Sequence, residues 1–220
     1  MKQLETVEIE TGPNPTASVV WLHGLGADGN DFVPVAHELE LPGRPIRFVF
    51  PHAPHQPVTI NGGMVMRAWY DILSADFERR ADERGLRASQ GLVEALLERE
   101  KARGTPAAQI VLAGFSQGGA IALQTGLRHP QRLAGIMALS CYVPLADSLD
   151  AERADANRGL PIFFGHGVQD EIIPVALARR SRDLLATLGY DVQWHEYGMP
   201  HSVCLEEIRD IGGWLRRVLG

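Results

Sequence analysis

The sequence has few cysteines, no excess of basic residues and no strongly charged tract of one sign. Only 2 cysteines occur among 220 residues, Cys141 and Cys204, and they form neither a C-x-x-C pair nor a metal-type spacing. We therefore expect free buried thiols, a reduced cytoplasmic protein and no metal site. The formal net charge of −6 gives no electrostatic support for binding to nucleic acid.

Long apolar runs are also absent. No window approaches the roughly 18 apolar residues of a membrane span, so we expect no integral membrane contact. The first residues, MKQLET, lack the apolar stretch of a signal peptide. No repeat and no Ser/Gly-rich linker divides the chain. With 45% hydrophobic and 22% charged residues, the composition is that of one globular domain, residues 1–220.

Short apolar runs alternate with longer helical patterns. Many of the runs are continuously apolar, as in strands covered on both faces, whereas the first alternates and suits a half-exposed edge. Such alternation predicts an α/β fold with a mainly parallel sheet flanked by helices on both faces and no large cap domain. The predicted strands are 6–10, 18–22, 47–50, 110–114, 135–139, 162–165 and 193–197. The predicted helices are 31–39, 87–103, 117–128, 175–188 and 203–219.

Two segments show no clear strand or helix pattern, and the start of the first helix is indicated by a single capping residue. Residues 51–74 read as one long irregular piece, and a loop of that length in a compact domain is usually functional or disordered. The Asp-rich stretch around Asp147 and Asp155 resembles an exposed loop. Asn30 is a candidate N-cap for the first helix.

The stretch AGFSQGG, at 113–119, places Ser116 where a strand should become a helix. Glycines at 114 and 118 remove side chains that would collide in a tight turn, so the turn can project the serine above the sheet edge. The following helix starts there, and the backbone N–H of Gln117 can donate to an oxyanion. This G-x-S-x-G pattern with its flanks predicts a nucleophilic serine, whereas an N-cap serine in a glycine-rich turn is the non-catalytic interpretation.

A serine nucleophile needs a base, and in this fold the order along the chain is serine, acid, histidine. His201 lies in a Gly/Pro loop after the last predicted strand, which favours it over the other histidines that follow Ser116. Asp170 follows a strand in GHGVQDEIIP and is the preferred acid. The adjacent Glu171 is the alternative.

A second oxyanion donor is expected after the first parallel strand. The loop HGLGADGN supplies one, and the backbone N–H of Leu25 is the candidate. The same loop formally matches G-x-G-x-x-G, but the chain has no ribose-binding acid about 20 residues later. Dinucleotide binding is therefore disfavoured, and no cofactor is expected. His52 and His55 lack further ligands for a metal.

The segments WLHGLGADGNDF, AWYD, GFSQGGAIAL, GHGVQDEIIP and GMPHSV occur in this order, and together they resemble the small carboxylesterase/acyl-protein thioesterase family of α/β-hydrolases. The resemblance spans nearly the whole chain. It implies Ser116 as nucleophile, Asp170 as acid and His201 as base, with Leu25 and Gln117 as oxyanion donors.

The same resemblance makes the loop bearing Met64, Met66 and Trp69 the family's acyl-binding flap. Methionine and tryptophan suit an apolar acyl chain, although core packing is the alternative role for each. The implied activity is cofactor-free cleavage of esters or thioesters with short-to-medium acyl chains. Acylated proteins or lysophospholipids are alternative main substrates, and a homodimer is compatible with the family. Acyl transfer to an alcohol or thiol, and a non-catalytic binding protein of this fold, are the rival functions.

Overall fold

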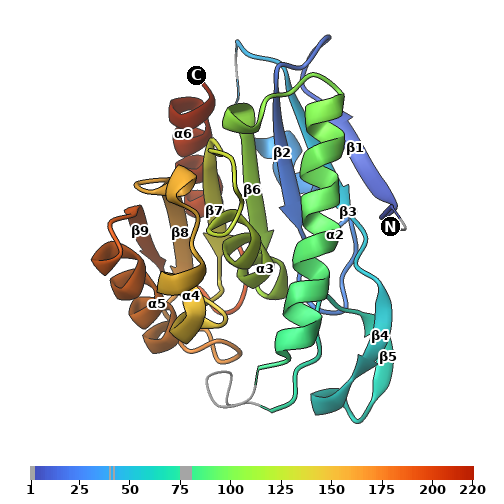
Figure 1. Cartoon of the computed structure of the whole chain (residues 1–220), viewed down its shortest axis with the longest axis vertical. Coiled ribbons are helices and arrows are strands. Elements are labelled where there is room, and N and C mark those ends of the chain that lie inside the picture. Colours follow the sequence, from blue (N-terminus) through green and yellow to red (C-terminus); the bar gives the residue numbers. More distant parts are fainter. Residues whose placement is uncertain (1–2, 40, 42, 75–80) are drawn as a thin grey trace.

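The computed structural model describes residues 3–39, 41, 43–74 and 81–220. Its main sheet has seven strands in the order β1-β3-β2-β6-β7-β8-β9 (Figure 1). β1 runs antiparallel to β3 at one edge, and the other neighbouring strands are parallel. These are the seven predicted strands, shifted by at most two residues, and the mainly parallel α/β sheet is confirmed. Their bounds are β1 (Thr6–Glu10), β2 (Ala17–Leu22), β3 (Ile46–Pro51), β6 (Ile110–Phe115), β7 (Gly135–Leu139), β8 (Pro161–Gly167) and β9 (Asp191–Tyr197).

Helices cover both faces of the sheet because its central strands are apolar on both sides. One buried cluster joins the sheet to α2, α3, α4 and α5, and a second joins the opposite face to α1 and α6. Figure 1 shows α2 and α3 in front of the sheet. The helices are α1 (Val33–Glu38), α2 (Glu83–Ala102), α3 (Gln117–Gly126), α4 (Ala146–Glu152), α5 (Val175–Thr187) and α6 (Leu205–Leu219).

The segment 51–74 is more regular than the sequence predicted. It contains an antiparallel hairpin of β4 (His55–Val58) and β5 (Met64–Arg67), joined by a 3-10 turn at Thr59–Asn61. Gly62 and Gly63 follow this turn with φ of 67° and 79°, a conformation that glycine adopts without a steric penalty. In Figure 1 the hairpin extends beyond the end of the sheet toward which the parallel strands point.

Several helix boundaries also differ from the prediction. α1 begins at Val33 without a side-chain cap, so Asn30 is not its N-cap; the carboxylate of Asp28 instead accepts the backbone N–H of Asn30. α2 begins four residues early because Asp82 accepts the N–H of Gly85 and caps it. The stretch around Asp147 is the short helix α4 rather than a loop. None of the described helices is long and apolar enough to cross a membrane.

A buried carboxyl group lies in the first turn of α6. Glu207 is 0% exposed, and neither of its carboxyl oxygens has a hydrogen-bond partner among the described residues. It packs against the backbone of Gly165 in β8, where a β-carbon would collide with it. Burial, and to a smaller extent the nearby Asp210, raises the pKa of Glu207 to about 8. The side chain is therefore mostly neutral at pH 7.

Replacing Glu207 by glutamine should flatten the pH dependence of stability between pH 4.5 and 8. In this window the folded chain binds more protons than the unfolded chain, whose carboxyl titrates near 4.5, so the free energy of unfolding falls as pH rises. The loss is on the order of a few kcal/mol. Denaturant unfolding at pH 5 and pH 8 measures it, with the exposed neighbour Glu206→Gln as control. Equal slopes in wild type and Glu207→Gln would contradict this assignment.

Candidate active site

Ser116 occupies the turn between β6 and α3 with an unusual backbone conformation. Its φ of 55° and ψ of −121° lie outside the regions that side-chain-bearing residues normally adopt. The backbone N–H of Ser116 donates to the carbonyl of Leu139 at the end of β7, at 2.8 Å, which ties the turn to the neighbouring strand. The serine thus stands at the carboxyl edge of the sheet, as the sequence predicted.

Glycines allow the chain to approach itself at this turn. A β-carbon at Gly114 would collide with the backbone of Gly118, and one at Gly118 would collide with the carbonyl oxygens of Leu22 and His23. The start of α3 therefore packs directly on the end of β2. This contact brings the predicted oxyanion loop beside Ser116, where a β-carbon on Gly24 would lie 3.5 Å from the serine Cβ.

Three side chains far apart in the sequence form a continuous hydrogen-bonded chain. His201 Nε2 lies 2.9 Å from Ser116 Oγ, and His201 Nδ1 lies 2.6 Å from Asp170 Oδ2. An ionised carboxylate only accepts, so Nδ1 carries the proton and Nε2 accepts from the serine hydroxyl. The ring of Phe115 packs against His201 at a centroid distance of 4.7 Å. Glu171, the alternative acid, is exposed, and the histidine contacts Asp170.

The loop after β8 keeps Asp170 ionised although the carboxyl is buried. Burial alone would raise the pKa of Asp170, but hydrogen bonds from His201 and from the backbone N–H groups of Ile173 and Ile172 lower it overall. His166 lies below this loop, with Nε2 donating to the Ile173 carbonyl at 2.9 Å. Burial lowers the pKa of His166, so its ring is neutral beside the carboxylate.

The two predicted oxyanion donors line the same cavity as Ser116. In the β2–α1 loop, the N–H of Gly26 donates to Arg67 and that of Ala27 donates to Gly24. The N–H of Leu25 has no acceptor among the described residues. Gln117 is the first residue of α3, where an N–H has no intrahelical acceptor. Both groups are therefore available to a bound oxygen.

The cavity at Ser116 has a volume of about 300 Å³ and a mostly apolar wall. Tyr70, Ile72, Tyr142 and Ile172 are among its lining residues, and Ile172 is 60% exposed. The hydroxyls of Tyr70 and Tyr142 are hydrogen-bonded at 3.2 Å. Burial raises the pKa of Tyr142 to about 12, so this hydroxyl is neutral. The cavity suits an uncharged acyl group.

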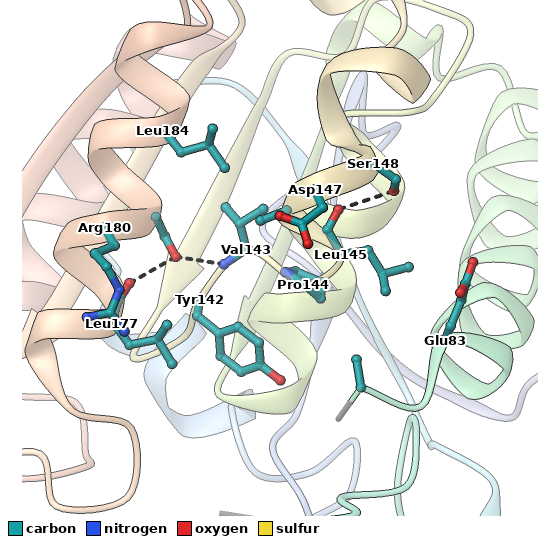
Figure 2. Close-up of a pocket in the computed structure, with 13 residues that line it drawn as sticks. Glu83, Tyr142, Val143, Pro144, Leu145, Asp147, Ser148, Leu177, Arg180 and Leu184 are labelled. Carbon is teal, nitrogen blue, oxygen red and sulfur yellow. Dashed lines mark hydrogen bonds between the residues drawn. The ribbon is translucent and has the colours of Figure 1, made fainter. Parts of the chain in front are cut away.

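A second cavity of about 490 Å³ adjoins the first, and Tyr142 lines both. Figure 2 shows it between α5, which contributes Leu177 and Leu184, and the segment from Tyr142 to Ser148 that leads into α4. Its lining combines apolar residues with the charged side chains of Glu83, Asp147 and Arg180.

Residues 4–219 match the family model described as phospholipase/carboxylesterase. The chain belongs to this family. Its curated relatives include acyl-protein thioesterase 1 of Yarrowia lipolytica, 39% identical over 98% of this chain and 97% of the relative, and acyl-protein thioesterase 1 of Mycosarcoma maydis, 40% identical over 100% and 99%. The solved structure of SOBER1 from Arabidopsis thaliana has a TM-score of 0.87 at 30% identity, covering 93% of this chain and 99% of that one.

Membership of the phospholipase/carboxylesterase family establishes the α/β-hydrolase fold and the chemistry. This family member is a serine hydrolase of carboxylic esters and thioesters. The resemblance stated from the five sequence segments is thus confirmed. Among the described residues, no group of three or more His, Cys, Asp or Glu side chains is arranged to hold a metal ion.

The predicted acyl contacts on the 51–74 segment need correction. Trp69 is 1% exposed and does not line the cavity at Ser116; its side chain is packed in the core beneath the site. Met64 is 64% exposed on the hairpin, and neither it nor Met66 lines that cavity. Met66 does lie beside the oxyanion loop, with its sulfur 3.9 Å from where a β-carbon on Gly26 would be. An acyl contact from either methionine stays a prediction.

Sequence reasoning missed most of the cavity wall in this hydrolase. Tyr142 follows β7 by three residues at the carboxyl edge, a position where functional side chains are expected, and this signal was available. Ile172 belongs to the segment that was searched only for an acid. Tyr70 belongs to the quoted AWYD segment. The pairing of Tyr70 with Tyr142 depends on tertiary packing and has no local signature.

Replacing Asp170 by asparagine should lower kcat by about 10³–10⁴-fold with little change in stability. The amide would donate to Nδ1 and so impose the other imidazole tautomer, in which Nε2 carries a proton and cannot accept one from Ser116. Steady-state kinetics on a nitrophenyl ester measure the effect. Glu171→Gln is the matched control and should retain wild-type kcat; the reverse pattern would make Glu171 the acid.

Proposed function

We propose that Ser116, His201 and Asp170 form the catalytic triad of this hydrolase and that catalysis proceeds through an acyl-enzyme on Ser116. The hydrogen-bonded chain from serine to histidine to aspartate, at 2.9 and 2.6 Å, carries the proposal. We further propose that residues 1–220 act as one domain, since the helices of both faces pack on a single sheet.

In the first half-reaction, Ser116 Oγ attacks the acyl carbonyl carbon while His201 Nε2 takes the hydroxyl proton. The carbonyl oxygen becomes an oxyanion and accepts from the N–H groups of Leu25 and Gln117. His201 then gives its proton to the leaving alcohol or thiol, and the carbon–oxygen or carbon–sulfur bond breaks. In the second half-reaction, a water molecule loses a proton to His201 and attacks the acyl carbon, and His201 returns that proton to Ser116 Oγ as the acyl–serine bond breaks. Asp170 stabilises the imidazolium in both steps.

The two oxyanion donors account for a large share of the rate. Removal of one such donor typically costs about 10²–10³-fold in kcat. The donors are backbone groups in the β2–α1 loop and at the start of α3, so they are in place before substrate binds. This arrangement costs no reorganisation when charge develops on the oxygen.

Acyl groups attached to proteins are the substrate class that we favour, because the curated relatives are named acyl-protein thioesterases. The cavity at Ser116 is open enough for a bulky leaving group, since Ile172 at its edge is 60% exposed. Lysophospholipids are the second candidate. A kcat/KM comparison of an S-acylated peptide, a small thioester and a lysophospholipid with one acyl chain separates these substrates.

Ser116→Ala should abolish turnover and labelling by a fluorophosphonate while leaving the thermal unfolding temperature within a few degrees of wild type. The hydroxyl is the only group removed, and the strained backbone is held by glycines and strand contacts rather than by the side chain. Intact-mass measurement after fluorophosphonate treatment should find one adduct on wild type and on the control Ser148→Ala. A folded wild type that takes up no label and hydrolyses no ester would disprove the proposed function.

Tyr142→Ala should shift the acyl-chain preference toward longer chains. Truncation joins the cavities of about 300 and 490 Å³, and each methylene that newly enters contributes about 0.8 kcal/mol, or roughly fourfold in kcat/KM. A series of matched oxygen esters and thioesters, from acetyl to palmitoyl, measures the shift. Tyr142→Phe keeps the ring and should keep the wild-type length profile; an unchanged profile in Tyr142→Ala would mean that the two cavities are not connected for substrate.

A further inference from the structure

Trp69 makes an unusual set of polar contacts for a core residue. Its indole N–H donates to the carbonyl of His23 at 2.9 Å, and its backbone N–H donates to Oε1 of Gln117 at 2.8 Å. Its own carbonyl accepts from the hydroxyl of Ser89 in α2. Each polar group of Trp69 is therefore engaged with a different segment of the chain.

Two of these segments carry the oxyanion donors. His23 immediately follows β2 and lies two residues before Leu25, and Gln117 supplies the other donor from its backbone. Leu25 and Gln117 are far apart in the sequence, so their relative position depends on tertiary contacts. Trp69 is hydrogen-bonded to both of these segments.

The side chain of His23 also holds the β2–α1 loop in place. Its Nε2 accepts the backbone N–H of Ala53 at 3.0 Å, so Nδ1 carries the proton and donates to the carbonyl of Gly24 at 2.7 Å. Burial lowers the pKa of His23 to about 4, which keeps the ring neutral and this tautomer in place. The ring also packs against Trp69, with centroids 5.4 Å apart.

The Gln117 side chain is fixed equally firmly. While Oε1 accepts from Trp69, Nε2 donates to the carbonyl of Tyr70 at 2.6 Å. Both ends of the amide thus bind consecutive residues of one segment. Gln117 as a whole residue is 2% exposed, so these hydrogen bonds are shielded from bulk water.

We propose that Trp69 is a positioning residue that sets the separation between the two oxyanion donors, the N–H groups of Leu25 and Gln117. The hydrogen bond from the indole to His23 holds the β2–α1 loop, and the hydrogen bond from the backbone N–H to Gln117 holds the start of α3. Because Trp69 is rigid, it fixes the distance between the two segments. The proposal rests on the proposed function and assigns Trp69 to transition-state stabilisation rather than to acyl binding.

Trp69→Phe tests the proposal because it keeps an aromatic ring and removes the indole donor. We expect kcat to fall about tenfold or more, with KM within threefold of wild type, for acetyl through octanoyl esters alike, because small displacements of catalytic groups cost large factors in rate. The affinity for a trifluoromethyl ketone, which forms an oxyanion adduct with Ser116, should fall in parallel with kcat/KM.

Trp214→Phe is the matched control. Trp214 is also 1% exposed, but its indole nitrogen has no hydrogen-bond partner among the described residues and it packs against Phe163 on the opposite face of the sheet. This variant should lose stability through packing alone and keep wild-type kcat. If Trp69→Phe does not fold, Gln117→Met breaks the same link from the other side while keeping its backbone N–H, and the same kcat loss is expected.

Three results would overturn the proposal. A loss in Trp69→Phe that grows with acyl-chain length would place the indole in acyl binding. A loss no larger than that of Trp214→Phe, or one confined to KM, would make Trp69 a packing residue. If Trp69→Phe does not fold, a wild-type kcat in Gln117→Met would also overturn the proposal. All of these require an active wild type, so they are distinct from failure of the proposed function, in which wild type neither reacts with the fluorophosphonate nor turns over ester.

Discussion

The close approach of α3 to the ends of β2 and β6 is the constraint on which the site depends. Gly114 and Gly118 permit backbone to touch backbone, and Ser116 between them is held at a φ of 55°. This backbone conformation costs on the order of 1–3 kcal/mol, so an isolated turn would relax from it. Here the hydrogen bond to Leu139 and the contacts with His23 prevent relaxation. The nucleophile is consequently presented at a fixed height above the sheet.

The electrostatics of the site follow from which buried groups are allowed to ionise. The imidazoles of His23 and His166 are kept neutral by burial, with each proton assigned by a backbone partner. Asp170 is also buried, yet backbone N–H groups and His201 keep it charged. A negative charge is thus placed beside the histidine that must become positive, while the surrounding rings add no competing charge. Burial disfavours the charged form of all three groups, and in Asp170 the hydrogen bonds to the carboxylate outweigh it.

Most of the fold, and the three residues that form the hydrogen-bonded chain from Ser116 to Asp170, could be predicted from sequence because their signals are local. Short apolar or alternating runs indicated all seven sheet strands, and Ser116, Asp170 and His201 each follow the end of one of these strands. The hairpin at 55–67 was missed because its two strands are only four residues long and largely exposed. The short helix α4 was missed because Leu149 is its one buried residue among those described. Both elements therefore lack the buried apolar pattern from which strands and helices were predicted.

The choice between acyl binding and core packing for Trp69 could not be made from the sequence for a similar physical reason. A tryptophan near Met64 and Met66 in a segment beside an active site reads as apolar lining, since sequence conveys the character of a side chain but not its direction. An oxyanion hole built from two backbone groups on separate segments cannot hold its spacing by local structure alone. Gly118 already brings the two segments into contact, and a large rigid side chain with one polar atom can fix their spacing further at little cost in conformational entropy. The bonds of Trp69 to His23 and Gln117 act in this way, so its size serves the geometry of the donors.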